Sequence, residues 1–329
     1  MDEATLTTFA FGDPPCATGA LGAFAGASPR HRLLAAIVLG AQGRYAAATT
    51  ILDSLRRGRD PLVASLAAST LASHRRQLGG HAAARKLDGA ALLAVGFSST
   101  EPDPAGLTAN GPSVAGPGSS GSGGAGPGPD EPGVADAVGP GASAAAPGTA
   151  DPHGLDVVGA RADALLGLAA DNLALGRLGA ARRLVVRAAR VDRRWRAAVR
   201  GGWVAAEIEL ADGQPAAAVA PARNALETAR ARGARRHAVK SAIVLGVALS
   251  GAGETGALEL VTEAVEETEK YELNSLIWVA TRVAADLDAR RDQEYRFRSR
   301  QVLHAVLQQA DPCVMRIARE SPWVPTGVG

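Results

Sequence analysis

The chain has 329 residues, and its 35 Lys and Arg residues nearly balance its 33 Asp and Glu residues, which leaves a formal net charge of +2. A net charge so close to zero gives no reason to expect a polyanionic partner, although local basic patches can still occur. The only cysteines, Cys16 and Cys313, are too few for a disulfide-rich secreted scaffold and lack the paired spacing of a zinc site.

The composition and the N-terminus favour a cytoplasmic protein. Lysine is scarce and alanine abundant, which indicates a GC-rich bacterial genome. The chain opens with Asp2 and Glu3 and lacks the basic and apolar segments of a signal peptide, so we expect residues 1–28 to be a flexible N-terminal segment. The longest apolar runs, 33–41 and 242–249, are less than half of the roughly 20 residues that a membrane helix needs.

A short phrase of small residues recurs along the chain, each time opened by a glycine. The phrase ends at Ala48, Ala84, Ala181 and Ala218, so the steps between copies are 36, 97 and 37 residues. Self-similarity at such a period marks stacked supersecondary units. Stretches with helical apolar periodicity flank each phrase, which predicts helical hairpins with the glycine in the turn.

The first pair of hairpins is expected over residues 29–97. Leu33, Leu34, Ile37 and Val38 make one helical stripe, and Ile51, Leu52 and Leu55 make the next. Gly43 falls at the break between the stripes, and Pro61 ends the second helix. An alanine early in each second helix lets the two helices approach closely.

These units resemble the tetratricopeptide repeat. In the first unit the matching residues are Ala35, Ala36, Leu39, Gly43, Tyr45, Ala48, Leu52 and Leu55. In the fourth unit they are Ala205, Ala206, Gly213, Ala218, Ala222 and Ala225. The resemblance implies an all-α, right-handed α-solenoid of about six hairpins, whose first helices line a concave groove.

A segment rich in Gly, Pro, Ser and Ala, residues 98–154, separates the second hairpin from the third. Its removal turns the long step of 97 residues into about one ordinary period. Such a composition cannot bury enough apolar surface to offset the entropy of ordering, so the sequence predicts a disordered linker.

Hairpins three to six are expected over residues 155–312. Ala257, Val261 and Ala264 continue the repeat phase into a fifth unit. A weaker sixth hairpin uses residues 274–287 and 293–309, as expected of a terminal unit. Residues 313–329 are expected to form a C-terminal tail.

One glycine motif, Gly251–Gly256, has the Gly-x-Gly-x-x-Gly spacing of a dinucleotide site. Because the repeat phase places an interhelical turn at this position, we interpret the motif as a turn, with a cofactor site as the lesser alternative. The six histidines lack metal-binding spacing, and no nucleophile and base share a legible motif. We therefore expect no cofactor, no metal and no catalytic residues, and hence no enzyme.

Arginine is concentrated in the band 182–240. The segment from residue 182 to residue 200 contains eight arginines and only one acidic residue, Asp192. They are Arg182, Arg183, Arg187, Arg190, Arg193, Arg194, Arg196 and Arg200, and the next unit adds Arg230, Arg232, Arg235, Arg236 and Lys240. Equivalent segments of adjacent repeats lie side by side, so we expect one basic surface; a solvated, arginine-rich face is the alternative.

A binding groove is predicted where the repeat phase brings tryptophans and charges onto the first helices. Its candidate residues are Arg200, Trp203, Glu207, Arg236, Lys240, Trp278 and Arg282. Trp and Arg are frequent hot spots of binding, although Trp203 could instead fill the core between repeats. We expect a protein-interaction module, scaffold or regulatory, that binds a partner segment in the groove. The alternative is a nucleic-acid-associated regulatory protein that uses the arginine band, although little aromatic interleaving and a near-neutral charge oppose it.

Overall fold

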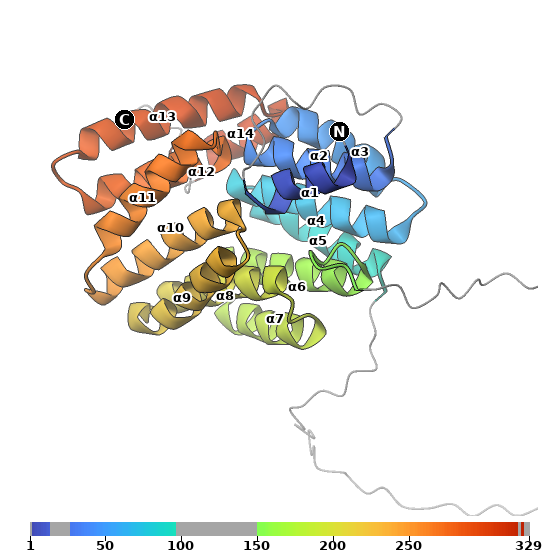
Figure 1. The fold of residues 1–329 in the computed structure, drawn as a ribbon, viewed down its shortest axis with the longest axis horizontal. Coiled ribbons are helices and arrows are strands. Elements are labelled where there is room, and N and C mark those ends of the chain that lie inside the picture. The colour runs from blue at the N-terminus through green and yellow to red at the C-terminus, as the bar shows by residue number, and fades with distance from the viewer. Residues whose placement is uncertain (1, 14–26, 97–149, 322–323, 326–329) are drawn as a thin grey trace, which may run out of the picture. The chain divides into compact units, whose positions relative to one another are not determined.

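The computed structural model describes residues 2–13, 27–96, 150–321 and 324–325. These residues form α-helices and no strand, so the prediction of an all-α fold is confirmed (Figure 1). The helices are α1 (Glu3–Phe11), α2 (Pro29–Ala41), α3 (Tyr45–Arg56), α4 (Pro61–Gln77), α5 (His81–Ala94), α6 (Val157–Ala174), α7 (Leu178–Val191), α8 (Trp195–Ala211), α9 (Pro215–Ala231), α10 (Arg235–Ala252), α11 (Ala257–Lys270), α12 (Asn274–Leu287), α13 (Asp292–Gln308) and α14 (Pro312–Glu320).

Helices α2 to α13 pair as six consecutive hairpins, and in each hairpin the first helix packs on the second. The predicted turn glycines have the left-handed backbone that other residues resist: φ is +75° at Gly43, +78° at Gly79, +71° at Gly176 and +70° at Gly213. The alanine that closes each phrase is 0% exposed in all four hairpins. The hairpin prediction and its steric reason are therefore both confirmed.

The glycine motif of 251–256 joins two helices. Gly251 lies near the end of α10, while Gly253 and Gly256 flank the turn with φ of +70° and +86°. A dinucleotide site needs the motif between a strand and a helix. Because the described residues contain no strand, the interpretation as a turn is the one that fits.

The last hairpin contacts the first. Successive first helices α2, α4, α6, α8, α10 and α12 pack in order, and α12 also packs on α2. The backbone N–H of Ala46 donates to the oxygen of Gln309 at 2.7 Å, and the Asn274 amide donates to the oxygen of Gln42 at 3.1 Å. In an open stack each unit contacts only its neighbours. The hairpins therefore form a circuit, whereas the sequence predicted an extended groove.

An apolar seam holds this circuit together. Tyr45 and Leu78 from the first two hairpins share a core cluster with Trp278, Val306 and other residues of α12, α13 and α14. The Cβ that a side chain at Gly43 would carry lies only 2.8 Å from Val306. Open stacks end in polar caps. Here the end faces are apolar, which explains why they pack against each other.

The expected flexible segment 1–28 begins with a packed helix, α1, while residues 14–26 lie outside the described part. Asp2 caps α1 by accepting a hydrogen bond from the Thr5 N–H at 2.8 Å. Leu6, Ala10 and Phe11 are buried, and α1 contacts α2 and α10. The N-terminal end of the chain is therefore part of the core.

The expected C-terminal tail 313–329 also begins with a helix. The Asp311 carboxylate caps α14 by accepting from the Val314 N–H at 3.1 Å. Val314 and Ala318 are buried on its one apolar face. The described part of this segment is therefore a capping helix rather than a tail.

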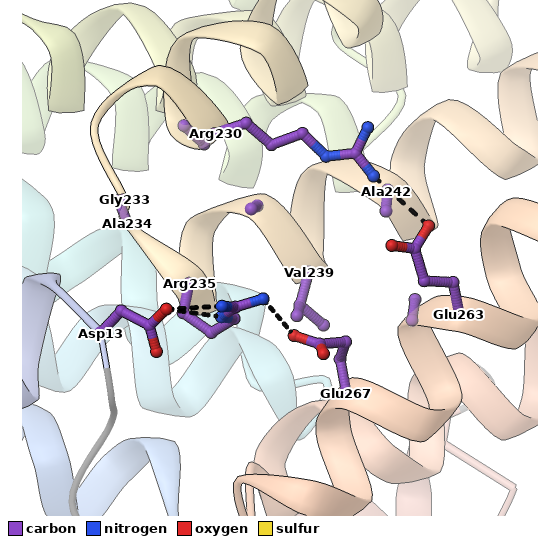
Figure 2. A pocket seen from close by; sticks show the side chains of 12 residues that line it. Asp13, Arg230, Gly233, Ala234, Arg235, Val239, Ala242, Glu263 and Glu267 are labelled. Atoms are coloured by element: carbon purple, nitrogen blue, oxygen red, sulfur yellow. Dashed lines mark hydrogen bonds and ion pairs between the residues drawn. The ribbon is translucent and has the colours of Figure 1, made fainter.

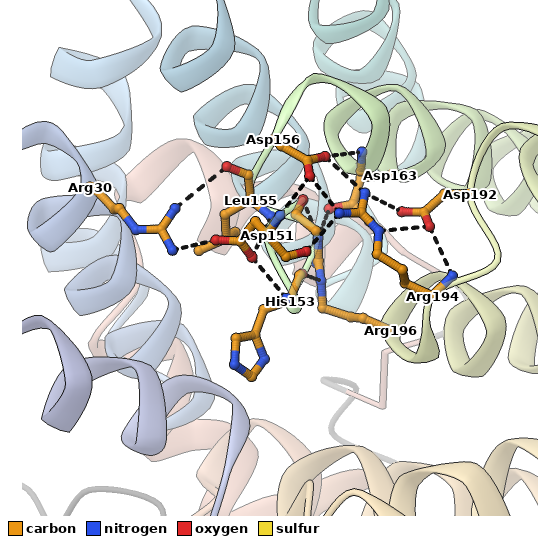
Figure 3. Close-up of polar contacts among 11 residues, drawn as sticks. Arg30, Asp151, His153, Leu155, Asp156, Asp163, Asp192, Arg194 and Arg196 are labelled. Atoms are coloured by element: carbon orange, nitrogen blue, oxygen red, sulfur yellow. Dashed lines mark hydrogen bonds and ion pairs between the residues drawn. The ribbon is translucent and has the colours of Figure 1, made fainter. Parts of the chain in front are cut away.

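The predicted linker 98–154 lies outside the described residues up to position 149, but its end is described and anchored. The Asp151 carboxylate pairs with Arg30 of α2 at 2.5 Å and accepts hydrogen bonds from the N–H groups of His153 and Leu155 (Figure 3). Asp156, the N-cap of α6, pairs with Arg194 of α8. The packed part of the chain therefore resumes at about residue 151, before the boundary that composition suggested.

We expect Asp151→Ala to lower the free energy of unfolding by roughly 1–2 kcal/mol, because it removes a half-buried ion pair and two backbone hydrogen bonds. Urea denaturation monitored by circular dichroism measures this. The matched control is Asp53→Ala, which removes only a surface pair with Arg56. Equal effects of the two changes would contradict the anchoring role.

Candidate binding pocket

A pocket lies among the first helices of hairpins two to five. Its larger part has a volume of about 570 Å³ and is lined by α4, α6, α8 and α10. A smaller cavity of about 100 Å³ adjoins it and shares Ser73, Gln77, Arg200, Trp203 and Lys240 with it. The larger volume falls within the range of small-ligand sites.

Five of the seven predicted groove residues line this pocket. Arg200, Trp203 and Glu207 follow each other at helical spacing on α8. Arg236 and Lys240 do the same one hairpin later on α10. Residues three or four apart share one face of a helix. The helical periodicity therefore explains why these five side chains lie close together, and their role in binding stays a prediction.

The other two predicted groove residues lie elsewhere. Trp278 is buried in the seam between the first and last hairpins, where its backbone oxygen accepts a hydrogen bond from Ser299 at 2.7 Å. Arg282 is partly exposed, with 43% of its side chain accessible, and pairs with Asp286 of its own helix. Both residues lie on α12, which closes the circuit, and this closure is what removes them from the pocket.

Trp203 is both a core residue and part of the pocket wall. It is 9% exposed, and its indole N–H donates to the Ser241 hydroxyl at 2.7 Å. One ring contact is the stacked His237, with centroids 5.5 Å apart, and the Lys240 ammonium lies 4.3 Å from the indole centroid. The two alternatives for Trp203 therefore coexist in one side chain.

Positive charge in the pocket is incompletely paired. Asp163 of α6 pairs with both Arg196, at 2.6 Å, and Arg200. Among the described residues no side chain forms a hydrogen bond or ion pair with Arg236 or Lys240. Together the two cavities are lined by five cationic side chains and by two carboxylates, those of Asp163 and Glu207. The cations are Arg76, Arg196, Arg200, Arg236 and Lys240.

The surroundings of Arg236 and Lys240 also lower the pKa values of both side chains. Burial lowers the pKa of Arg236, and the neighbouring Arg200 lowers it further. Burial also lowers the pKa of Lys240, against the opposing effect of Glu207. Each cation is thus less stable here than in water, and a bound anion would relieve this cost.

Two buried histidines face the smaller cavity. Burial lowers the pKa of His74 to about 3, with Arg236 contributing. Burial likewise holds the pKa of His237 well below its ordinary value. The Nδ1 atom of each ring has no hydrogen-bond partner in the described structure. Both rings are therefore neutral at physiological pH.

One wall of the larger part is apolar. It is formed by side chains of α6 and α8, namely Leu166, Ala170, Leu173, Ala174, Val204 and Ala211. At its outer end Gly176 and Ala211 are exposed to solvent. The pocket therefore combines a cationic interior with an apolar wall that leads to the surface.

Helix α1 covers the smaller cavity, a feature that the sequence did not suggest. Phe11 lines this cavity, stacks on His153 with centroids 5.1 Å apart, and lies beneath the Arg196 guanidinium at 5.5 Å. The apolar residues Leu6, Phe9, Ala10 and Phe11 among the first eleven were the available signal.

The arginine band does not form the single basic surface that we expected. Arg194 is turned inward to Asp156 and Asp192, and Arg196 to Asp163 (Figure 3). Arg182 pairs with Glu209 and Asp212 of the next hairpin. Asp156 and Asp163 come before the band in sequence, and Glu209 and Asp212 lie about 30 residues after Arg182, so the local sequence did not reveal these pairs. Much of the band is thus neutralised within the molecule.

A buried ionic cluster behind the pocket also escaped prediction. Arg76 of α4, 12% exposed, contacts the carboxylates of Asp88 and Asp171, which are both 0% exposed. Gly167 leaves room for it, since a Cβ there would lie 2.2 Å from the Asp88 carboxylate. The cluster joins α4, α5 and α6 and therefore links the hairpins on either side of residues 97–149.

A second cavity, of about 140 Å³, lies between α9, α10 and α11. Figure 2 shows Arg235 held between Asp13 and Glu267, with both ion pairs near 2.5 Å: 2.5 Å to Asp13 and 2.6 Å to Glu267. Arg230 similarly faces Glu263. Its charged side chains satisfy one another, so this cavity is a weaker candidate than the pocket with unpaired cations.

Two further features were sought in the described residues. No group of three His, Cys, Asp or Glu side chains among them is arranged to hold a metal ion. None of the helices in this part of the chain has the length and apolarity needed to cross a bilayer. Comparison of the chain with known proteins found no matching family model and no matching curated protein.

Proposed function

We propose that the protein is a non-enzymatic interaction module of the bacterial cytoplasm, which binds a segment of a partner protein in the pocket among α4, α6, α8 and α10. The observation that carries this proposal is that Trp203 lines the pocket together with Arg236 and Lys240, two cations that pair with no carboxylate of the described residues, with Lys240 over the Trp203 ring. Buried aromatic and arginine side chains supply most of the energy at protein interfaces. We further propose that the hairpins are tetratricopeptide-like with a right-handed superhelical twist.

Charge gives the pocket a preference among partners. Unpaired cations in a cavity of low polarity attract negatively charged groups and disfavour cationic ones. Because an isolated buried cation is costly, the unliganded pocket has free energy to gain from a complementary segment. Binding is therefore expected to neutralise the site.

A nucleic-acid-associated role through the arginine band 182–240 is the second candidate. The exposed Arg183, Arg190 and Arg193 of α7 and its C-terminal turn favour it. The inward pairing of Arg194, Arg196 and Arg200 opposes it, because paired arginines release fewer counterions from a nucleic acid.

A peptide selection tests the proposal. Random displayed peptides retained by the native chain should lose retention on Arg236→Glu but not on Arg282→Glu, a matched charge reversal outside the pocket. Duplex DNA should not be retained at about 150 mM salt. Retention of DNA that falls steeply with salt, together with peptides that ignore Arg236→Glu, would favour the nucleic-acid role instead.

A further inference from the structure

We infer that the group which the pocket accepts is an organic anion: a carboxylate or phosphate bonded to an apolar body, presented at the tip of the partner segment. This inference rests on the proposed function and specifies the chemistry of its ligand. In this inference the cationic interior binds the carboxylate or phosphate, which we call the head, and the wall formed by α6 and α8 binds the apolar body of the ligand.

The head is assigned by the unpaired cations. Arg236 and Lys240 are four residues apart on α10 and both line the cavity, so one anion can reach both side chains. Arg200 already shares Asp163 with Arg196 and adds to the positive field. Guanidinium donates to carboxylate and phosphate in a bidentate manner, and ammonium donates as a point charge.

The two histidines add no positive charge beside this head. His74 and His237 line the same cavity as Arg236 and Lys240. Burial lowers the pKa of both rings, which leaves them neutral and places the positive charge of the cavity on the arginine and lysine side chains.

The body is assigned by the remaining wall. Leu166, Leu173 and Val204 line the larger part of the pocket between the cations and the exposed end at Gly176 and Ala211. Burial of each methylene group against such a wall strengthens binding roughly fourfold, a gain that a bare inorganic anion lacks. An anion with an apolar chain therefore fits better than inorganic phosphate.

The alternatives fit less well. A cationic ligand would meet Arg196, Arg200, Arg236 and Lys240 against the carboxylates of Asp163 and Glu207, while Arg76 is already paired with Asp88 and Asp171. A neutral apolar ligand would leave Arg236 and Lys240, both partly buried, without an ion-pair partner. The pocket thus selects for charge as well as for shape.

Four eight-carbon probes test the inference on the full chain: octanoate, octyl phosphate, octanol and octyltrimethylammonium. An NMR titration should show octanoate or octyl phosphate binding with Kd on the order of 1 mM, as expected of ligands of about ten heavy atoms. The double change Arg236→Gln with Lys240→Gln should weaken this binding by about tenfold or more, and Arg282→Gln should not. A preference for octanoate would indicate an acidic residue in the partner, and a preference for octyl phosphate a phosphorylated one.

The failures are distinguishable. Octanol binding as tightly as octanoate, or octanoate binding that ignores the double change, would overturn the inference while leaving the pocket as a site. If none of the four probes binds while peptides are still retained through Arg236, the inference is wrong and the proposed function stands. Loss of both signals in a folded native chain would overturn both.

Discussion

Arg76→Met is expected to lower the free energy of unfolding by about 3–5 kcal/mol. The change leaves Asp88 and Asp171, both 0% exposed, facing each other without their shared cation. Burial already raises the pKa of Asp88 to about 6 in the presence of Arg76. Without the guanidinium this pKa rises further, so the charged carboxylate becomes costlier at neutral pH. Urea denaturation at pH 7 measures the loss.

Two comparisons identify the cause. The control Arg282→Met removes an exposed pair on α12 and should change the unfolding free energy by less than about 1 kcal/mol. Adding Asp88→Asn and Asp171→Asn to Arg76→Met should recover part of the loss, because no uncompensated charge remains. A loss that persists in full in the triple variant would mean that packing of the arginine side chain is responsible, contrary to the prediction.

The sequence was enough to find the hairpins because each one is specified locally. A turn glycine, an early alanine and two apolar stripes lie within about 36 residues, and none of them depends on a distant residue. Gly43 with φ of +75° and Ala48 with 0% exposure are what that local pattern requires. The same reasoning missed the terminal helices α1 and α14, because each is a single helix that contains no copy of the repeat.

Closure of the circuit could not be predicted, because it depends on which end faces meet. Tyr45 matches the repeat pattern, and nothing in that pattern tells a buried seam with α13 from contact within one hairpin. Trp278 therefore entered the predicted groove although it belongs to the seam. Repeat phase correctly brought together side chains of neighbouring hairpins, as for α8 and α10, but it misplaced those of the last hairpin, which packs on the first.

Charge pairing was the second failure of sequence reasoning. Counting arginines in the band 182–240 shows where positive charge is, but the balancing carboxylates come from other hairpins. Asp163, for example, is 33 residues before Arg196 and pairs with it at 2.6 Å. Of the basic residues in the band that pair with no described carboxylate, Arg236 and Lys240 line the pocket, whereas Arg183, Arg190 and Arg193 are exposed on the surface.

Acidification should destabilise the protein through the same pocket. His74 and His237 are neutral and buried in the folded chain, and burial lowers the pKa of His74 to about 3. A depressed pKa means that the stabilisation is complete above the unfolded value of about 6.5 and is lost as the pH falls below it. Each histidine then contributes a loss of roughly 1.4 kcal/mol per pH unit. Asp88, whose pKa is raised to about 6, opposes this loss between about pH 6 and its unfolded value of 3.8.

Chemical denaturation between pH 7 and pH 4.5 measures the balance. Unfolding of the native chain should become easier as the pH falls, with about one histidine's worth of slope remaining below pH 6 after the opposing effect of Asp88. His74→Gln and His237→Gln should each flatten the pH dependence, whatever they do to stability at pH 7. His304→Gln, a change at an exposed ring on α13, should leave the slope as it is. Equal slopes in all four proteins would show that the two buried rings accept protons without unfolding, and would contradict a dry, cationic interior.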